Sequence, residues 1–274
     1  MKKILTQALV IFFLTFTTFT VHSEENCEPE FELNKSVLNQ AISKDEKKGE
    51  VFVFFDQSTT MQGFTIDQPG QNNLYVNIVD DIQQVAENIG TDTIYQKFGS
   101  EINTMSDRDV AKVKTPKFYE CSGSAVSCNN QFSSIKEIFA IAEDVPEATH
   151  IVITHLSLQD SQLLASDREA ITGPLISILK QGKSIGIIGV MNSFNGKIDN
   201  IPLRSGEYTD YVDAESRPFY VLVIGNQNNI NRIKNEIEVK HFSTNKDKFK
   251  YALITSNPIL QNLNVNKLIE ENYM

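Results

Sequence analysis

Residues 51–63 read Val51-Phe52-Val53-Phe54-Phe55-Asp56-Gln57-Ser58-Thr59-Thr60-Met61-Gln62-Gly63. Five consecutive apolar residues are typical of a strand that is buried on both faces of a sheet. Asp56 directly follows this run, and ligands of open α/β sheets bind beyond the carboxyl ends of such strands. The stretch therefore predicts a core strand that delivers an aspartate and two hydroxyl side chains, Ser58 and Thr60, to a binding edge.

Strand patterns and helix patterns alternate along the chain that follows. Further strands are predicted at 93–98, 151–154, 185–190 and 219–225, and helices at 73–89, 135–142, 167–180 and 230–237. A short edge strand is considered at 117–119, the 167–180 helix is expected to be interrupted near Gly173-Pro174, and 197–217 is expected to be a long loop. This alternation predicts an α/β fold with a doubly wound, mostly parallel central sheet and helices on both faces.

The N-terminal segment has the pattern of a secretory signal peptide. Lys2 and Lys3 precede an apolar run over 4–21, and cleavage is expected after Ser23. An uncleaved membrane anchor is the alternative, but Gln7 and the repeated threonines of this run suit the hydrocarbon core poorly. We therefore expect an exported protein, periplasmic or extracellular.

Beyond residue 23, the sequence predicts a polar N-terminal arm over 24–49 and one domain over 50–274. The formal net charge is −10, and loss of the two leader lysines makes the mature chain more acidic still. Binding to phosphate-rich partners requires concentrated Lys and Arg, so we expect no nucleic-acid partner. Because the leader is expected to be a cleaved signal peptide, we also expect no stable membrane insertion.

Three cysteines, Cys27, Cys121 and Cys128, belong to the predicted mature chain. An exported protein matures in an oxidising compartment, where cysteines pair. Cys121 and Cys128 are the nearest in sequence and are expected to form a disulfide. The alternative is a bond between Cys27 and either of them.

The residues that follow the first strand resemble the metal-ion-dependent adhesion site of von Willebrand factor A (vWA) domains. The first loop of that site reads D-x-S-x-S, often followed by Met, one residue and Gly. Asp56, Ser58 and Thr60 match it, with Thr keeping the second hydroxyl, and Met61 and Gly63 follow. The resemblance implies a vWA-like domain that holds a divalent cation and binds a partner protein. It also implies that an acidic side chain of the partner completes the coordination of the cation.

The resemblance also implies a hydroxyl from a second loop and an aspartate after the strand at 151–154. Ser133 is the best match for the hydroxyl, with Ser134 as the fallback, although Ser133 could equally be a helix N-cap. In place of the expected aspartate the sequence has Thr154-His155. An imidazole suits Zn²⁺, Mn²⁺ or Fe²⁺ better than Mg²⁺ or Ca²⁺.

The predicted ligand set is accordingly Asp56, Ser58, Thr60, Ser133 and His155. The expected ion is Mg²⁺, Mn²⁺ or Ca²⁺, with Zn²⁺ possible because of the imidazole. A degenerate site that binds no metal remains the alternative.

Two other functions are compatible with parts of the sequence. A haloacid dehalogenase-like phosphohydrolase would use Asp56 as the nucleophile, with Thr154 and Lys183 in supporting roles, but its second acid is missing where Ser58 or Thr60 stands. A metal-free structural subunit would share the vWA-like fold without an ion. The binding module is preferred, and no catalysis is expected.

Overall fold

The structure is a computed structural model that describes residues 48–66, 72–120, 133–156, 165–202 and 208–255. The predicted signal peptide, nearly all of the predicted arm, and Cys27, Cys121 and Cys128 lie outside these residues. The predicted leader and disulfide therefore stay predictions.

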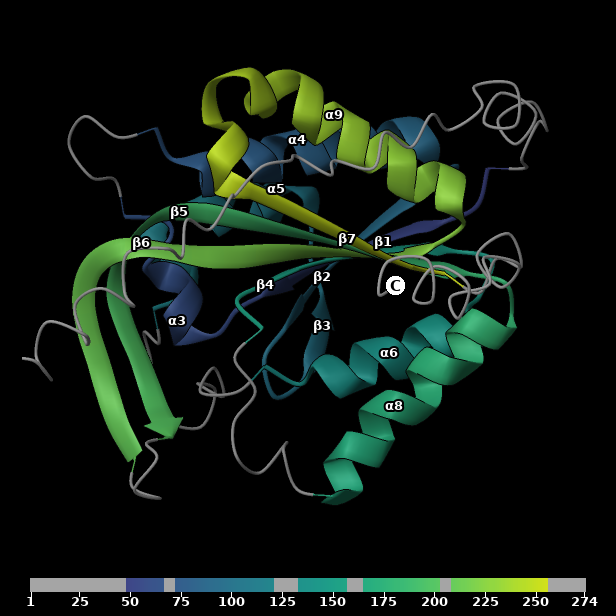
Figure 1. Cartoon of the computed structure of the whole chain (residues 1–274), viewed down its shortest axis with the longest axis horizontal. Coiled ribbons are helices and arrows are strands. Elements are labelled where there is room, and N and C mark those ends of the chain that lie inside the picture. Colours follow the sequence, from purple (N-terminus) through teal and green to yellow (C-terminus); the bar gives the residue numbers. More distant parts are fainter. Residues whose placement is uncertain (1–47, 67–71, 121–132, 157–164, 203–207, 256–274) are drawn as a thin grey trace, which may run out of the picture. The chain divides into compact units, whose positions relative to one another are not determined.

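One sheet organises the described part of the chain. Its strand order is β3-β2-β1-β4-β6-β5-β7 (Figure 1). The strands are β1 (Val51–Asp56), β2 (Thr93–Phe98), β3 (Ile102–Thr104), β4 (Thr149–Thr154), β5 (Ser184–Pro202), β6 (Tyr208–Gly225) and β7 (Phe249–Thr255). The α-helices are α3 (Thr59–Gln62), α4 (Leu74–Ile89), α5 (Asp107–Val110), α6 (Ile135–Asp144), α8 (Ala165–Lys180) and α9 (Gln227–Asn245), and the 3₁₀ helices are η1 (Ala111–Lys114), η2 (Pro116–Phe118) and η3 (Lys246–Lys248).

The predicted fold class, an α/β sheet of the doubly wound type, is confirmed. At the centre of the sheet β1 pairs in parallel with both β2 and β4. The remaining pairs, β2–β3, β4–β6, β6–β5 and β5–β7, are antiparallel. Strand β5 therefore runs in the same direction as β1, whereas β3, β6 and β7 run in the opposite direction. The sheet is thus mixed, with four of its seven strands running the same way.

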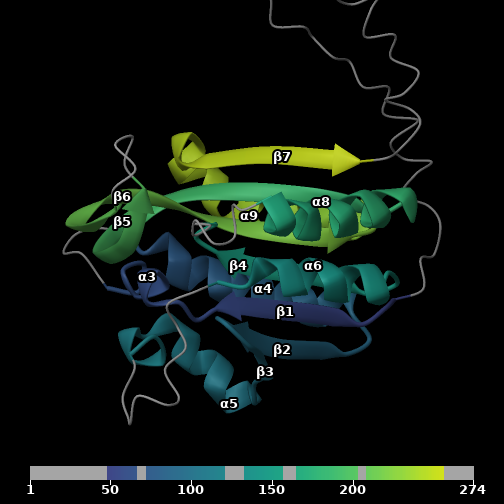
Figure 2. The ribbon, with the colours of Figure 1, turned by 90° about the horizontal axis from the view of Figure 1, so that it is seen from below.

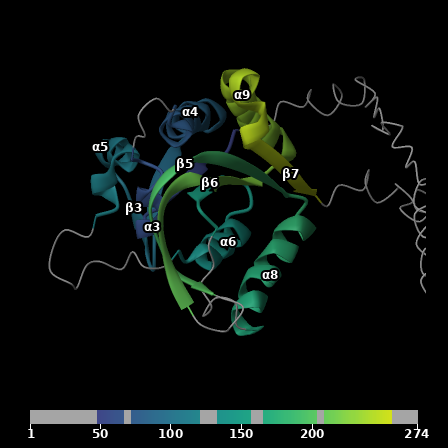
Figure 3. The ribbon, with the colours of Figure 1, turned by 60° about the vertical axis from the view of Figure 1, so that its left-hand side comes forward.

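Helices cover both faces of the sheet. Neighbouring residues of β1 point to opposite faces: Phe55 packs in one core with Ile78 of α4 and Ile233 of α9, whereas Phe54 packs in another with Ile138 of α6. The helix α8 lies beside α6 on that second face (Figure 3). A strand with a core on each side must be apolar at every position, which explains the continuous run 51–55.

Two local expectations differ from the structure. Residues 116–118 form η2 rather than an edge strand, because Pro116 at the first position pre-sets a helical φ. The edge beside β2 is the short strand β3. The helix α8 continues through Pro174, since an interior proline removes one backbone hydrogen bond without always ending a helix.

The largest correction concerns residues 185–225. The predicted strands at 185–190 and 219–225 form one long antiparallel hairpin, β5–β6, and most of the predicted loop at 197–217 belongs to its two strands. Strand β6, not β5, therefore lies next to β4. Buried apolar runs look alike in parallel and antiparallel strands, so the sequence pattern carries no direction.

The hairpin extends beyond the rest of the sheet as a two-stranded ribbon (Figures 1 and 2). Pairing of β5 with β7 ends at Val190, and pairing of β6 with β4 ends at Tyr220. The ribbon packs on the turn that follows β1: the Asn195 N–H donates to the Gly63 carbonyl at 2.9 Å, and the buried ring of Phe194 meets Phe64 edge-on at 5.0 Å. The ribbon and the Asp56 turn are thus held together.

His150 provides the first testable prediction. Its ring stacks on Phe52 at 5.2 Å, its Nε2 hydrogen-bonds to the Val145 carbonyl, and its buried Nδ1 has no hydrogen-bond partner among the described residues. Burial lowers the pKa of His150 from 6.5, opposed by the Val145 hydrogen bond. A second proton would be placed on a buried nitrogen that has no acceptor.

Below pH 6.5 the unfolded state therefore binds more protons than the folded state at this residue, so stability falls as the pH drops through this range. We expect the free energy of unfolding of His150→Phe to depend less on pH than that of wild type between pH 7.5 and 5.5. The two slopes should differ by at most about 1.4 kcal/mol per pH unit. Urea unfolding across this range measures the difference. Parallel curves for the two proteins would contradict the assignment.

Candidate functional site

Asp56 ends β1 at the carboxyl edge of the parallel strands, as the sequence predicted. Its side chain is buried, with 1% of its surface exposed. One carboxylate oxygen, Oδ1, accepts a hydrogen bond from the backbone N–H of Ser58 at 2.8 Å. This local hydrogen bond between side chain and backbone fixes the orientation of the carboxylate and forms the turn that leads into α3.

The other oxygen, Oδ2, accepts hydrogen bonds from two hydroxyls that come from distant parts of the chain. Ser133 Oγ donates at 2.5 Å from the loop before α6, and Thr154 Oγ1 donates at 2.7 Å from the end of β4. Both side chains are buried. Ser134, rather than Ser133, is the N-cap of α6, so Ser133 is not engaged as the cap.

Ser58 and His155 form a second contact beside the carboxylate. Ser58 Oγ lies 3.1 Å from His155 Nε2. Burial lowers the pKa of His155. The nearby negative charge of Asp56 opposes this effect but does not cancel it. A neutral imidazole keeps a nitrogen lone pair available for a hydroxyl proton or for a metal ion.

The backbone after β4 is held in an uncommon conformation. Leu156 has a φ of 53°, and its N–H donates to Thr154 Oγ1 at 3.2 Å. A leucine rarely adopts this left-handed conformation, and such residues cluster at functional sites. Thr154 Oγ1 therefore both donates to Asp56 and accepts from this turn.

Of the predicted ligands, the structure brings Asp56, Ser58, Ser133 and His155 together. Thr60 is buried in α3, but the structure records no hydrogen bond between its hydroxyl and Asp56. Thr154 also contacts Asp56, although it is not among the metal ligands predicted from the sequence. Its position at the end of a predicted strand beside β1 was the signal that could have found it.

Additional contacts hold the loop at residues 111–120 against the site turn. Gln57 Nε2 donates to the Phe118 carbonyl at 3.0 Å. The buried Tyr75 and Tyr119 hydroxyls lie 2.6 Å apart, and Tyr119 donates onward to the Val113 carbonyl. Burial raises the pKa of both tyrosines, with Asp56 adding to the effect, so both stay neutral near pH 7.

The donor set can be compared with what a divalent cation requires. A hydroxyl that donates its proton to Asp56 still carries oxygen lone pairs, so the carboxylate can orient Ser133 and Thr154 as ligands. Within the described ranges, however, no group of three or more His, Cys, Asp or Glu side chains is placed to hold a metal ion. What the cluster would offer a cation is neutral hydroxyl oxygens, one carboxylate and one imidazole.

Lys183, considered for a phosphohydrolase, lies far from this cluster. It precedes Ser184, which pairs with Gly225 at the opposite end of the sheet from Asp56. Its ammonium group lies 3.5 Å from Glu147. The three residues considered for phosphoryl chemistry are thus not assembled, although Thr154 does contact Asp56.

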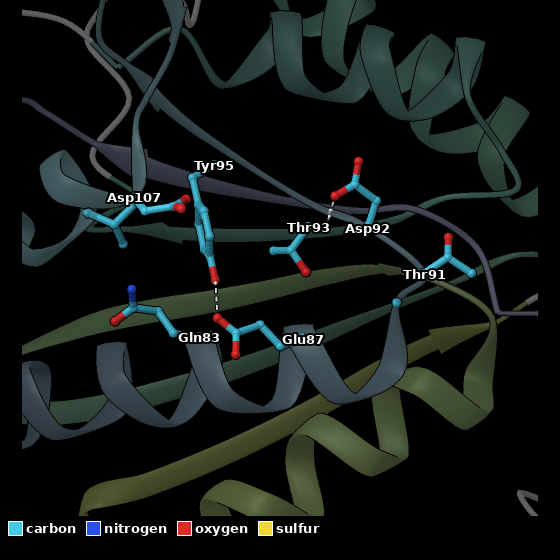
Figure 4. Close-up of a pocket in the computed structure, with 9 residues that line it drawn as sticks. Gln83, Glu87, Thr91, Asp92, Thr93, Tyr95 and Asp107 are labelled. Atoms are coloured by element: carbon cyan, nitrogen blue, oxygen red, sulfur yellow. Dashed lines mark hydrogen bonds between the residues drawn. The ribbon is translucent and has the colours of Figure 1, made fainter.

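A cavity of about 360 Å³ lies at that opposite end, near the start of β2 (Figure 4). Glu87, Asp92 and Asp107 line it, together with Tyr95, whose hydroxyl donates to Glu87 at 3.4 Å. Burial, together with Glu87 and Asp107, raises the pKa of Tyr95 to about 12. The cavity shares no residue with the Asp56 cluster.

Comparisons with protein-family models, with curated proteins and with solved structures gave no match. In the part of the chain that the structure describes, no helix is long and apolar enough to span a membrane.

Proposed function

We propose that this chain is an exported vWA-like protein-binding module that uses a divalent cation at the Asp56 cluster. The single observation that supports this most is the convergence of the Ser133 and Thr154 hydroxyls on one buried carboxylate oxygen, from positions 77 and 98 residues away in the chain. Such convergence at the carboxyl ends of strands is where ligands of open α/β sheets bind.

The cation would be held by Asp56, Ser58, Ser133, Thr154 and His155, with Thr60 nearby. Hydroxyl and carboxylate oxygens suit Mg²⁺, Mn²⁺ and Ca²⁺, and the imidazole shifts the preference toward Mn²⁺ or Zn²⁺. A bound cation supplies positive charge at the edge of the sheet, where an acidic side chain of a partner protein can complete the coordination. The adjacent ribbon would extend the same binding surface.

A titration of the mature protein with Mg²⁺, Ca²⁺, Mn²⁺ and Zn²⁺ tests this proposal. An ion that binds only the folded state stabilises it by about 2.7 kcal/mol when present at 100 times its Kd. We expect Mn²⁺ or Zn²⁺ to raise the melting temperature more than Mg²⁺ or Ca²⁺. Asp56→Asn should abolish the increase while preserving the size of the side chain.

The matched control is Glu50→Gln. Glu50 is exposed and precedes the same strand at its opposite end, so its variant should respond to ions as wild type does. Equal stabilisation of wild type and Asp56→Asn would contradict the site. Loss of the response in both variants would indicate general charge screening instead.

A metal-free subunit is the second candidate, and one observation favours it. Asp56 already accepts three hydrogen bonds from within the protein, which is enough to stabilise a buried carboxylate without an ion. This candidate predicts no response to any of the four ions. It also predicts that partner capture is the same with and without a chelator.

A further inference from the structure

The side chain of Asn192 lies at the base of the ribbon. Strand β5 pairs with β7 only as far as Val190, so Asn192 follows the point where the ribbon leaves the sheet. Only 1% of its surface is exposed. A buried side-chain amide destabilises the fold unless its donor and acceptor groups have hydrogen-bond partners. The partners of Asn192 therefore identify the elements that this residue joins.

The amide of Asn192 joins three segments of the chain. Its Oδ1 accepts a hydrogen bond at 2.9 Å from the backbone N–H of Leu74, the first residue of α4. Its Nδ2 donates to the carbonyl of the next residue at 2.9 Å, with longer contacts of 3.3 Å to Asn73 Oδ1 and 3.5 Å to the Phe64 carbonyl. One side chain thus links the ribbon to the beginning of α4 and to the end of the Asp56 turn.

The Asp56 turn, residues 56–64, depends on contacts of this kind. Its helix α3 has four residues, and a helix this short is not stable without tertiary contacts. Before α3, the Ser58 N–H is held by the Asp56 carboxylate. After α3, the Phe64 carbonyl accepts from Asn192 and also from Asn73 Nδ2, at 3.0 Å. The two ends of the turn are therefore fixed by the candidate site on one side and by the ribbon on the other.

The ribbon also touches the same turn through its backbone (Figure 1). The Asn195 N–H donates to the Gly63 carbonyl at 2.9 Å. A Cβ on Gly196 would lie 2.7 Å from Gly63 Cα, so the two backbones are in direct contact. Packed contacts of this density do not deform continuously, and a movement on one side is passed to the other. A displacement of the ribbon must therefore move the Asp56 turn.

We propose that Asn192 couples the ribbon to the Asp56 turn, and that a cation at the Asp56 cluster thereby holds the ribbon in place. The coupling is reciprocal: displacement of the ribbon weakens cation binding by the same factor by which the cation favours the docked ribbon. Control of the ribbon by the cation rests on the proposed function, whereas the coupling through Asn192 does not. Because the ribbon is part of the proposed binding surface, the cation prepares that surface for a partner.

Amide hydrogen exchange resolved by residue, on the mature protein without added metal, tests the coupling. In Asn192→Ala the Ser58 N–H should exchange faster than in wild type by on the order of 10-fold, measured relative to Val152 at the centre of β4. The Val152 rate reports global unfolding, so the ratio isolates local opening of the turn. Ser58 precedes α3 and Phe64 follows it, so an effect confined to the immediate contacts of Asn192 does not reach Ser58.

Asn229→Ala is the matched control. Asn229 Nδ2 donates to Thr149 Oγ1 at 2.9 Å, and these residues lie at the beginnings of α9 and β4. The control variant therefore removes a long-range amide hydrogen bond of the same kind at the opposite end of the sheet from Asp56. It should leave the ratio of Ser58 to Val152 exchange rates as in wild type. An equal increase in both variants, or no increase in Asn192→Ala, would overturn the coupling.

A second variant separates the support of α4 from the coupling to the turn. Asn192→Asp keeps an oxygen that accepts from Leu74 but, as a carboxylate, cannot donate to Phe64. We expect the Leu74 N–H to stay protected in this variant while the Ser58 N–H exchanges faster. Wild-type exchange rates at both positions would contradict the role of the donated hydrogen bond.

Zn²⁺ tests the control of the ribbon by the cation. Saturating Zn²⁺ should slow exchange of the Asn195 N–H in wild type, and calorimetric titration should give a Kd for Asn192→Ala that is weaker by on the order of 10-fold. Absence of binding to wild type would overturn the proposed function together with this control, whereas the metal-free rates still decide the coupling. Equal Zn²⁺ affinities with an unchanged Ser58 rate would overturn the coupling and leave the proposed function intact.

Discussion

Asp56→Ala is expected to destabilise the protein by about 3 kcal/mol, because hydrogen bonds to a charged acceptor contribute roughly 1.5–3 kcal/mol each. Three donors lose their acceptor at once: the Ser58 N–H and the Ser133 and Thr154 hydroxyls. The side chain is buried, so water cannot readily replace it. Relief from burying a negative charge offsets part of the loss.

Urea unfolding at pH 7 without added metal measures this effect. Glu50→Ala, at the exposed opposite end of the same strand, is the control and should change stability by less than about 0.5 kcal/mol. Ser133→Ala removes only one of the three donors and should cost less than Asp56→Ala. A loss for Asp56→Ala that is no larger than that of Glu50→Ala would show that the cluster does not stabilise the fold.

The second large effect is expected where the ribbon meets the site turn. Phe194 is fully buried, and Phe194→Ala should cost about 3–5 kcal/mol. Gly63 has an ordinary helical backbone, with φ of −60°, but a Cβ there would lie 2.3 Å from the Phe194 ring. Gly63→Ala should therefore cost about 1–3 kcal/mol through this contact alone.

The double variant Gly63→Ala/Phe194→Ala separates the effect of the contact between these two residues from unrelated losses of stability. When Phe194 is already alanine, the methyl group of Gly63→Ala has room, so the double variant should be more stable than the sum predicts by about 1 kcal/mol or more. Gly173→Ala is the control, since a Cβ at that position in α8 meets nothing within 4 Å and alanine favours a helix. Strictly additive losses would contradict the packing.

Much of the fold could be predicted because its core strands are continuous apolar runs. The same runs could not reveal that β6 returns antiparallel between β4 and β5, since burial on both faces erases the alternation that would carry orientation. Most of the ribbon was predicted as a loop, over 197–217, because its polar residues resemble a connection. β7 was not predicted at all.

The site was partly predictable for a related reason. Asp56 and His155 follow strands that the sequence identified, and parallel strands bring their carboxyl ends together. Thr154 was recognised at a strand end, but its hydrogen bond to Asp56 depends on side-chain direction, which spacing alone does not determine. The contact between Ser58 and His155 and the left-handed backbone at Leu156 likewise leave no mark in the sequence pattern.

The strand order also sets the sequence in which the sheet can be completed during synthesis. β4 lies between β1 and β6, yet β6 leaves the ribosome only after α8 and the whole of β5. Until residue 225 has been made, the apolar edge of β4 has no neighbour on that side. Pairings over such separations slow folding. A nascent chain that stops short of β6 should therefore remain unfolded and depend on chaperones.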